Sequence, residues 1–398
     1  MPRYMIRRFV PFAASLLSLG ALAACNSNPP SPDASASADA EVPDASSTPM
    51  ADPLASHDPG PGMPPDPSAT DDQPRPLMKA QVILERQGFA PGIIDGKMGL
   101  STRNAIAGFQ EANGLKATGE LDDPTGAALD RWNMIAATRV VTIPADFAAE
   151  SFAPLPKDPA EQAKLKRLGY QSIDEKLAER FHTTVQTLRD LNPGVGANPA
   201  AGSPAASPSP TGSATPPPPM FAAGQQIRVP NVGADALDPS AVDKPDWLET
   251  LRSLGVGTSQ PDAAKIVVSK AKGTLKAYDE GGKLVALFTV TTGSSHDPLP
   301  LGEWKINGTS YNPQFSYDPS LFWDVPDSKG EHLLPPGPNG PVGVVWIDLS
   351  KEHYGIHGTP EPETIGRAES HGCVRLTNWD AARLAQMVGT KTRVIFEA

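Results

Sequence analysis

Two side chains near the C-terminus have the chemistry of a nucleophile and its base. Cys373 is the only cysteine after residue 25, so it has no disulfide partner within the chain once the N-terminus is set aside. His357 lies upstream of it, and a lone cysteine with a separate histidine is typical of nucleophilic catalysis when the fold brings them together. The thiol reacts as the thiolate, so its free pKa of about 8.5 would have to be lowered by nearby cations. His357, His371 and Arg375 could supply that charge.

The neighbours of Cys373 favour this interpretation over the commoner one, in which a lone cysteine is a small buried apolar residue. Val374 and Leu376 alternate with Cys373 and Arg375, which predicts a short strand. Gly372 allows the close backbone approach that an oxyanion site needs. The pattern therefore predicts a nucleophile at the start of a strand, beside backbone N–H groups.

The sequence around these residues resembles the L,D-transpeptidase catalytic domain of the YkuD type. The resemblance rests on His-Gly-Thr at residues 357–359, followed by Ser-His-Gly-Cys-Val-Arg-Leu at residues 370–376. It covers residues 263–398 and includes Thr-Thr-Gly at 291–293, Pro-Leu-Gly at 300–302 and Pro-Pro-Gly-Pro-Asn-Gly-Pro at 335–341. Leu301 and Gly340 stand where the family often has threonine and asparagine, and both lie in loops.

The resemblance implies a cysteine acyltransferase of bacterial peptidoglycan. His357 would activate Cys373, and the backbone carbonyl of Gly358 would orient the imidazole ring. The thiolate would attack the third, diamino-acid residue of a stem tetrapeptide and form a thioester, which the amine of a neighbouring stem would resolve. Backbone N–H groups around His371 and Gly372 would hold the oxyanion.

Ser370 and Gly358 belong to the same predicted oxyanion and substrate-binding loops. Arg375 would hold a substrate carboxylate, or it would only pair with an acidic neighbour. The residues are equally compatible with a hydrolase on the same fold, an L,D-carboxypeptidase or endopeptidase, and with attachment of a protein or a D-amino acid to peptidoglycan. A wall-binding lipoprotein with an inert catalytic domain is disfavoured by the intact His357 and Cys373.

A metal site is the rival interpretation of the histidines. His353 and His357 stand four residues apart, with His371 and Cys373 further along. If His357 ends a strand, side chains at i and i+4 share a face about 13 Å apart, which is too far for two ligands of one ion. We therefore predict no metal and no cofactor.

Composition limits the possible partners and the number of domains. A chain of 398 residues predicts several domains, and its 45 prolines are concentrated in a few stretches. The net charge of −11 argues against nucleic acid and against an anionic membrane surface as partners. Two cysteines exclude a disulfide scaffold.

Residues 1–24 indicate an export signal: a basic start, an apolar run too short to span a bilayer comfortably, and small residues after it. Leu-Ala-Ala-Cys at residues 22–25 resembles the lipobox of bacterial lipoproteins, which implies that Cys25 carries lipid; an ordinary cleaved signal is the alternative. The expected location is the cell envelope, as a membrane-anchored lipoprotein facing the periplasm. Residues 25–75, rich in Pro, Ala, Ser and Asp, predict a disordered tether.

The expected fold class is multidomain, with two small units ahead of the C-terminal domain. Residues 76–135 predict a three-helix bundle, with Asp123 as the cap of its third helix, and resemble a peptidoglycan-binding domain. A generic small bundle is the alternative. Peptidoglycan is therefore the expected partner of this unit as well as the substrate.

Residues 160–232 predict a small interrupted α/β unit, with a Pro/Ala/Ser-rich insert at residues 197–219. Two short helical segments precede the insert and a strand follows it, which resembles a LysM module whose first strand is not recognisable. Glycan would be its ligand. We expect His182, in this unit, to be a surface residue without a partner.

Residues 263–398 predict a mostly-β sandwich with one late helix. Runs rich in Val, Ile, Leu and Thr predict strands at residues 265–269, 274–279, 283–291, 303–307, 342–348, 354–357 and 393–396. Thr377 begins a capping-box pattern that opens the helix, and Gly389 closes it.

Overall fold

The computed structural model describes residue 71 and residues 73–195, 218–321 and 330–398, all within one structural unit, Ala51–Ala398. The predicted signal, Cys25, nearly all of the tether and most of the insert at 197–219 lie outside the described residues. A search of the described residues finds no helix with the length and apolar character needed to cross a bilayer.

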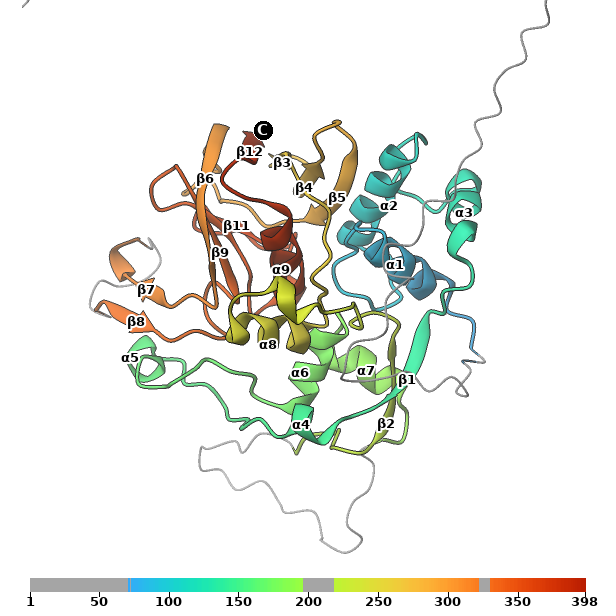
Figure 1. The fold of residues 1–398 in the computed structure, drawn as a ribbon, viewed down its shortest axis with the longest axis horizontal. Helices are drawn as coiled ribbons and strands as arrows, with labels where there is room; N and C mark the ends of the chain where they lie inside the picture. Colours follow the sequence, from blue (N-terminus) through green and yellow to red (C-terminus); the bar gives the residue numbers. More distant parts are fainter. Residues whose placement is uncertain (1–70, 72, 196–217, 322–329) are drawn as a thin grey trace, which may run out of the picture. The chain divides into compact units, whose positions relative to one another are not determined.

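The N-terminal unit, residues 76–132, is the predicted three-helix bundle (Figure 1). Its helices are α1 (Pro76–Arg86), α2 (Leu100–Ala112) and α3 (Asp123–Leu129), and a 3-10 turn at Asp130–Trp132 follows. The cap of α3 is Asp122 and not Asp123, because the Asp122 carboxylate accepts the Thr125 N–H. Phe109 lies edge-on to Phe89 and to Trp132, with both pairs of ring centroids 5.9 Å apart. These rings fill the centre of the bundle.

The middle unit begins earlier than the predicted residue 160. Strand β1 (Thr138–Thr142) pairs antiparallel with β2 (Gln226–Pro230), and helices α6 (Ile173–Arg180) and α7 (Val185–Leu191) lie between them in the chain. The first strand was not recognisable because a long segment with only two short helical turns, α4 (Ala145–Ala148) and α5 (Pro159–Gln162), separates it from α6. Residues 138–232 therefore form this unit, with an apolar cluster of their own around Phe181 and Leu177.

A helix that the sequence analysis did not anticipate leads into the C-terminal domain. After a 3-10 turn at Pro239–Ala241, α8 (Pro245–Leu254) runs to Gly255, whose positive φ of 66° ends the helix. Its Trp247, Leu251 and Leu254 are buried in the main core.

The C-terminal domain is built on one eight-stranded sheet with the order β11-β10-β9-β6-β12-β3-β4-β5. Every strand predicted from the sequence is present in it. The strands are β3 (Lys265–Ser269), β4 (Thr274–Tyr278), β5 (Leu284–Thr289), β6 (Gly302–Tyr311), β9 (Val345–Leu349), β10 (Gly355–His357), β11 (Val374–Arg375) and β12 (Arg393–Glu397). A separate two-stranded ribbon consists of β7 (Phe315–Tyr317) and β8 (His332–Leu334), and further 3-10 turns lie at Pro319–Leu321 and Pro362–Thr364.

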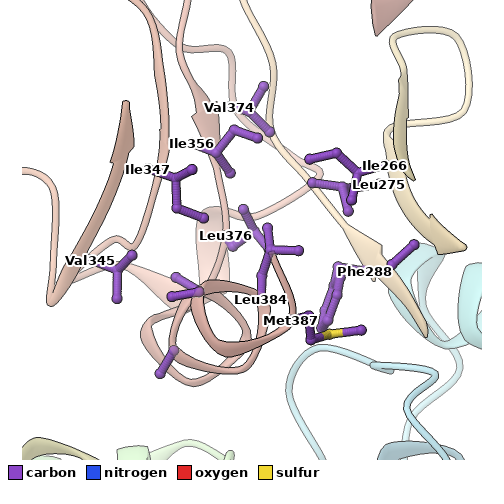
Figure 2. Close-up of a cluster of buried hydrophobic side chains, with 14 of the residues drawn as sticks. Ile266, Leu275, Phe288, Val345, Ile347, Ile356, Val374, Leu376, Leu384 and Met387 are labelled. Carbon is purple, nitrogen blue, oxygen red and sulfur yellow. The ribbon is translucent and has the colours of Figure 1, made fainter. Parts of the chain in front are cut away.

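This sheet curls until its two halves face each other, so the expected sandwich is a single bent sheet. The long strand β6 pairs first with β12 and then with β9, with an irregularity between Ile306 and Gly308. At the open end, Thr291 after β5 bridges to Arg375 of β11. Apolar side chains of both halves meet helix α9 (Asn378–Met387) in the core (Figure 2). Thr377 caps that helix as predicted, accepting the Asp380 N–H at 3.1 Å.

The N-terminal unit adds backbone to the free edge of the sheet. Phe89 bridges to Leu287 of β5, where the Ala90 N–H donates to the Leu287 carbonyl at 2.8 Å and the Leu287 N–H donates to Gly88 at 3.0 Å. Leu284 and Leu287 join the apolar cluster of the bundle. The edge strand is thereby covered, which removes a site for unwanted strand pairing.

Buried polar side chains join all the units. Arg383 of α9 pairs with Glu85 of α1 at 2.9 Å, and the same carboxylate bonds His182 at 2.7 Å. The prediction that His182 is a surface residue is wrong. It is fully buried, its Nδ1 donates to the Glu85 carboxylate, its Nε2 lies 3.1 Å from the Leu254 carbonyl, and its ring stacks on Trp379. It was mispredicted because its partners come from other units of the chain.

Candidate active site

Strands β10 and β11 bring the predicted base and nucleophile to one face of the sheet. The two strands run parallel, with Ile356 opposite Val374 and His357 opposite Arg375. Because side chains alternate along a strand, Cys373, Arg375 and His357 share one face, while Ile356 and Val374 point into the core on the other. The short strand predicted from the alternation around Cys373 is therefore confirmed.

The His357 ring is held in one orientation. The side chain is buried, and Nδ1 lies 2.7 Å from the carbonyl oxygen of Gly358. A carbonyl only accepts hydrogen bonds, so Nδ1 carries the proton and Nε2 keeps its lone pair. Trp346 stacks on the ring with a centroid separation of 5.5 Å and an interplanar angle of 24°. The predicted role of the Gly358 carbonyl in orienting the base is thus seen in the geometry.

Burial weakens the charged form of both groups. Burial, and next the positive charge of Arg375, lower the pKa of His357 to about 4, although the Gly358 hydrogen bond acts in the opposite direction. Burial also raises the pKa of the Cys373 thiol, against the hydrogen bond from the Gly355 N–H and the charge of Arg375, which both lower it. The expectation of a thiol pKa below the ordinary value is therefore wrong, because desolvation outweighs the one nearby cation.

At neutral pH the pair is a thiol beside a neutral imidazole. The partly exposed thiol donates to the His353 carbonyl, with Sγ 3.7 Å from the oxygen. Among the described residues it has no hydrogen bond to His357. A neutral imidazole with a free Nε2 has the chemistry of a general base.

The loop before Cys373 is fixed by Ser370 and Gly372. The buried Ser370 hydroxyl donates to the Cys373 carbonyl at 2.6 Å, and its N–H donates to Thr292 at 3.1 Å. Gly372 has a φ of 109°, and a Cβ there would lie 3.0 Å from the Tyr354 ring. Ser370 therefore shapes the loop, and only glycine fits at position 372 without strain.

Arg375 and His371 differ in their surroundings. Arg375 is partly buried beside Cys373, its Nε is buried without a partner, and within the described residues its side chain forms no ion pair. The charge of Glu361 acts on Arg375 and raises its pKa, against the larger effect of burial. His371 is partly exposed on the nucleophile loop. A guanidinium beside the nucleophile, with no ion pair among the described residues, is suited to bind an anionic group.

The histidines do not gather around an ion. His353 lies in an exposed turn before β10, with a positive φ of 62°, and only its carbonyl approaches the thiol. In the parts of the chain that the structure describes, no three His, Cys, Asp or Glu side chains are arranged to hold a metal.

Comparisons with known proteins identify the family. A family model for the L,D-transpeptidase catalytic domain matches residues 263–396, and one for a peptidoglycan binding domain matches residues 76–129. A Bacillus licheniformis relative named as the L,D-transpeptidase YkuD is 30% identical over 222 residues, which are 55% of this chain and 90% of the relative. The chain belongs to the L,D-transpeptidase family. Members of this family are acyltransferases of peptidoglycan, and both resemblances in the sequence, to the catalytic domain and to the peptidoglycan-binding domain, are confirmed.

Other transpeptidases are similar over less of the chain. A Fuscovulum blasticum relative named as an L,D-transpeptidase is 32% identical over 182 residues, or 44% of this chain and 91% of that one. L,D-transpeptidase 3 from Mycobacterium tuberculosis, a solved structure, is 18% identical with a TM-score of 0.28, covering 34% of this chain. The chain spans 61% of that structure's length.

Three residues around the transpeptidase site were not found from the sequence. Trp346 stacks on the base, Tyr354 packs against Gly372, and Asn378 lies under Gly358. Trp346 lies in a predicted strand, where its alternation with core residues could have placed it on the face of His357. For Asn378, at the start of a helix, the sequence carries no comparable indication.

Proposed function

We propose that the protein is a cysteine-dependent L,D-transpeptidase that cross-links third-position diamino acids of peptidoglycan stems through a thioester. The observation that carries the proposal is the Gly358 carbonyl on Nδ1 of His357, which leaves Nε2 as the acceptor on the face shared with Cys373. Hydrolysis of the same bond, and attachment of a protein or a D-amino acid, are the competing outcomes of the same acyl-enzyme.

The reaction has two balanced halves. Nε2 of His357 takes the thiol proton while Sγ of Cys373 attacks the carbonyl carbon of the third residue of the donor tetrapeptide. The C–N bond to the terminal D-alanine breaks, and the leaving amine takes the proton from the imidazolium. The amine of a neighbouring stem then attacks the thioester, gives its proton to His357, and the thiolate leaves.

Two groups would support the transition state and the substrate. Backbone N–H groups around His371, Gly372 and Cys373 would hold the developing oxyanion, each such donor contributing roughly 3–4 kcal/mol in comparable sites. Arg375, without an ion-pair partner among the described residues, would hold a substrate carboxylate. Both roles follow from their positions next to the nucleophile.

The remaining parts would keep the enzyme at the wall. We propose lipid on Cys25, export to the cell envelope as a lipoprotein facing the periplasm, and a tether over residues 25–75. The peptidoglycan-binding domain and the middle unit, in which α6 and α7 stand between two paired strands as in a LysM-like glycan-binding module, would raise the local concentration of stems. No cofactor and no nucleic acid take part in this proposal.

The test is intact-mass spectrometry with a disaccharide tetrapeptide and, separately, a carbapenem. We expect an acyl adduct on the wild type, none on Cys373→Ala, and a cross-linked dimer when acceptor is present. His357→Ala should lose about 10²–10⁴ in rate, and His371→Ala less. An adduct on Cys373→Ala contradicts the nucleophile, and tripeptide without any dimer identifies a carboxypeptidase.

A further inference from the structure

The carbonyl that orients His357 belongs to a tightly enclosed peptide group, the one that joins Gly358 to Thr359. Gly343 packs against it so closely that a Cβ there would lie 2.8 Å from the carbonyl carbon of Gly358 and 2.9 Å from the nitrogen of Thr359. Asn378 touches it as well, because a Cβ at Gly358 would collide with Oδ1 of Asn378. These two neighbours leave the peptide group little room to rotate, so its oxygen stays on Nδ1 of His357.

The Asn378 side chain is itself fixed by backbone groups of the catalytic domain. It is fully buried, its Oδ1 accepts the Val344 N–H at 3.2 Å, and its Nδ2 donates to the Pro338 carbonyl at 3.0 Å. An N–H group only donates and a carbonyl only accepts, so these two bonds determine that the amide oxygen faces Gly358. Helix α9 does not need this side chain as a cap, because the Thr377 hydroxyl has that role. The buried amide therefore serves neighbouring segments and not its own helix.

The middle unit supplies the remaining hydrogen bond of Asn378. Nδ2 donates to Oε1 of Glu179 in α6, 2.7 Å away. The Glu179 carboxyl is buried and is also hydrogen-bonded to the Tyr170 hydroxyl, which belongs to the same unit. Glu179 is thereby anchored in the middle unit while it holds the first residue of α9.

The same unit holds the loop that presents the Pro338 carbonyl to Asn378. The Leu168 N–H donates to the Pro336 carbonyl at 2.9 Å, and the Leu168 carbonyl accepts the Asn339 N–H at 3.0 Å. Loop residues on both sides of Pro338 are thus hydrogen-bonded to the middle unit. Both acceptors of the Asn378 amide therefore depend on where that unit lies.

The tautomer of His357 decides whether the ring can act as a base. With the Gly358 carbonyl on Nδ1, the proton stays on that nitrogen and Nε2 keeps its lone pair. If the peptide group turned, the carbonyl would leave Nδ1 and the proton would be shared between the two nitrogens. The fraction of molecules with a free Nε2 would then fall, and with it the rate of the step that removes the Cys373 proton.

We propose that Asn378 is a positioning residue for His357, and that α6 of the middle unit completes its support through Glu179. The inference rests on the proposed function, in which Nε2 of His357 is the base, and deepens it. The middle unit becomes part of the scaffold of the active site, in addition to its proposed role at the wall. Neither Asn378 nor Glu179 is a catalytic residue, because each acts through the Gly358 peptide group.

The first experiment substitutes Asn378 in the full-length chain. The rate of Cys373 acylation is measured at increasing carbapenem concentrations, which separates the limiting rate from the half-saturating concentration. Asn378→Ala should lower the limiting rate about 10- to 100-fold, because a small displacement of a reacting group has effects of this size, and should leave the half-saturating concentration unchanged. A wild-type limiting rate in Asn378→Ala would overturn the inference.

Asn192→Ala is the matched control. Asn192 is also a buried amide with three hydrogen bonds to backbone: Nδ2 donates to the Leu188 and Arg228 carbonyls at 2.8 Å, and Oδ1 accepts the Arg228 N–H at 2.7 Å. All three bonds lie within the middle unit. Asn192→Ala should therefore lose stability as Asn378→Ala does, yet keep the wild-type limiting rate. Equal losses of rate in the two variants would show a general effect of stability and would overturn the inference.

A double substitution tests the contribution of α6 with side chains of unchanged size. Asn378→Asp keeps an oxygen for the Val344 N–H but turns the donor toward Glu179 into an acceptor, so that two carboxyl groups meet and acylation should slow. Adding Glu179→Gln supplies an amide donor from the side of α6, and it should raise the limiting rate again by a factor of a few. No recovery in the double variant would refute the role of α6. Because both changes keep the side-chain volume, this pair decides the question even where Asn378→Ala does not fold.

The ¹⁵N signals of the His357 ring test the positioning role without any reaction. Burial, and next the charge of Arg375, lower the pKa of His357 to about 4, so the ring is neutral at neutral pH and its two nitrogens report the tautomer. The wild type and Asn192→Ala should show only the Nδ1–H form, whereas Asn378→Ala should show a mixture. Identical signals in the wild type and Asn378→Ala would refute the positioning role. A wild type that no carbapenem acylates would instead count against the proposed function, which these signals do not measure.

Discussion

Two buried glutamates, Glu85 in the N-terminal unit and Glu179 in the middle unit, contact the same helix of the catalytic domain with opposite results. Burial alone would raise the pKa of Glu85, but Arg383 and the His182 hydrogen bond reverse this and hold the pKa below its usual value. Burial raises the pKa of Glu179 to about 7, because its partners Tyr170 and Asn378 are neutral and compensate only in part. The difference lies in the partners and not in the depth of burial.

The comparison separates two kinds of contact. The ion pair of Glu85 with Arg383 is called here the fixed joint, and the hydrogen bond of Glu179 with Asn378 the adjustable joint. Arg383 and His182 hold the pKa of Glu85 below its usual value, and its ion pair with Arg383 fastens α1 to α9. The pKa of Glu179 is raised to about 7, so a change in pH near neutrality can alter how it holds Asn378. The N-terminal unit therefore attaches to α9 through an ion pair that stabilises the fold. The middle unit attaches through a hydrogen bond whose strength changes with the protonation of Glu179.

The largest expected effect comes from removing the cation of the fixed joint. Arg383→Met leaves Glu85 and Asp235 buried without their main partner, which should lower the free energy of unfolding by about 3–5 kcal/mol. The measurement is denaturant unfolding. Arg393→Met is the matched control, because it removes an exposed pair with Glu303 and should cost about 0–1 kcal/mol. Equal losses of unfolding free energy in the two variants would mean that the buried ion pair stabilises the protein no more than the exposed one does.

The adjustable joint should appear in the pH dependence of stability. Unfolded, Glu179 titrates near 4.5, and folded at about 7, so the folded state keeps a proton in this window that the unfolded state has lost. The contribution of Glu179 to the free energy of unfolding is full below pH 4.5 and is lost as the pH rises to about 7. Glu179→Gln cannot ionise, so between these pH values it should gain at most about 3 kcal/mol relative to the wild type.

Denaturant unfolding of both proteins at several pH values between 4 and 8 checks this expectation. The contribution of Glu85 has the opposite sign and a different window, because its folded pKa is lowered: it is present above the unfolded value of 4.5 and disappears as the pH falls below that value. A constant difference between wild type and Glu179→Gln would place Glu179 in the same class as Glu85.

The sequence predicted local features well and contacts between units poorly. Strand β3 at residues 265–269 and the cap at Thr377 were found because both depend on neighbouring residues. Strand β1 was missed since its partner β2 lies far along the chain, and His182 was misplaced because Glu85 belongs to another unit.

The sequence identified the candidate nucleophile, but it did not predict the directions in which the pKa values of Cys373 and His357 are shifted. A motif identifies Cys373 and His357, yet it contains no information on desolvation, which decides the direction of both pKa shifts. Asn378 was invisible for a similar reason, because its role depends on Glu179, Gly343 and Gly358 meeting around it. Burial and long-range packing are properties of the fold, and short patterns do not encode them separately.

A substitution at the edge of the sheet should change stability without changing the site. Gly88 has a φ of 85°, and a Cβ there would lie 2.8 Å from the Val285 carbonyl of β5. Gly88→Ala should therefore lower the free energy of unfolding by about 1–3 kcal/mol. Gly114→Ala is the control for backbone strain alone, since its φ of 69° is similar but its surroundings are open.

The same two variants sharpen the comparison through the reactivity of Cys373. Alkylation of the thiol should proceed at the wild-type rate in Gly88→Ala, because Gly88 packs against Val285 of β5, away from β10 and β11. Slower alkylation of Cys373 in Gly88→Ala, but not in Gly114→Ala, would show that the packing of the N-terminal unit also affects the active site. The contrast with the middle unit would then fail.

The smallest effect concerns two arginines that repeat the contrast between the glutamates. Glu85 and Asp235 offset the burial of Arg383 and raise its pKa, whereas burial lowers the pKa of Arg375, which has no ion pair among the described residues. The charge of Arg375 is therefore free to act on Cys373, whose thiol pKa it lowers. Arg375→Ala should raise that pKa further, so that less thiolate is present at any pH below it.

Iodoacetamide alkylation of Cys373 as a function of pH measures this effect. The wild-type rate should still be rising above pH of about 8.5, the usual thiol pKa, because burial has raised the value. The Arg375→Ala curve should lie at higher pH, with a rate at pH 8 lower by a factor of a few, and Arg375→Lys should restore most of it because it keeps the charge. Superimposable curves would show that solvent screens the charge of Arg375 from the thiol. Arg375 would then behave as an ordinary surface cation.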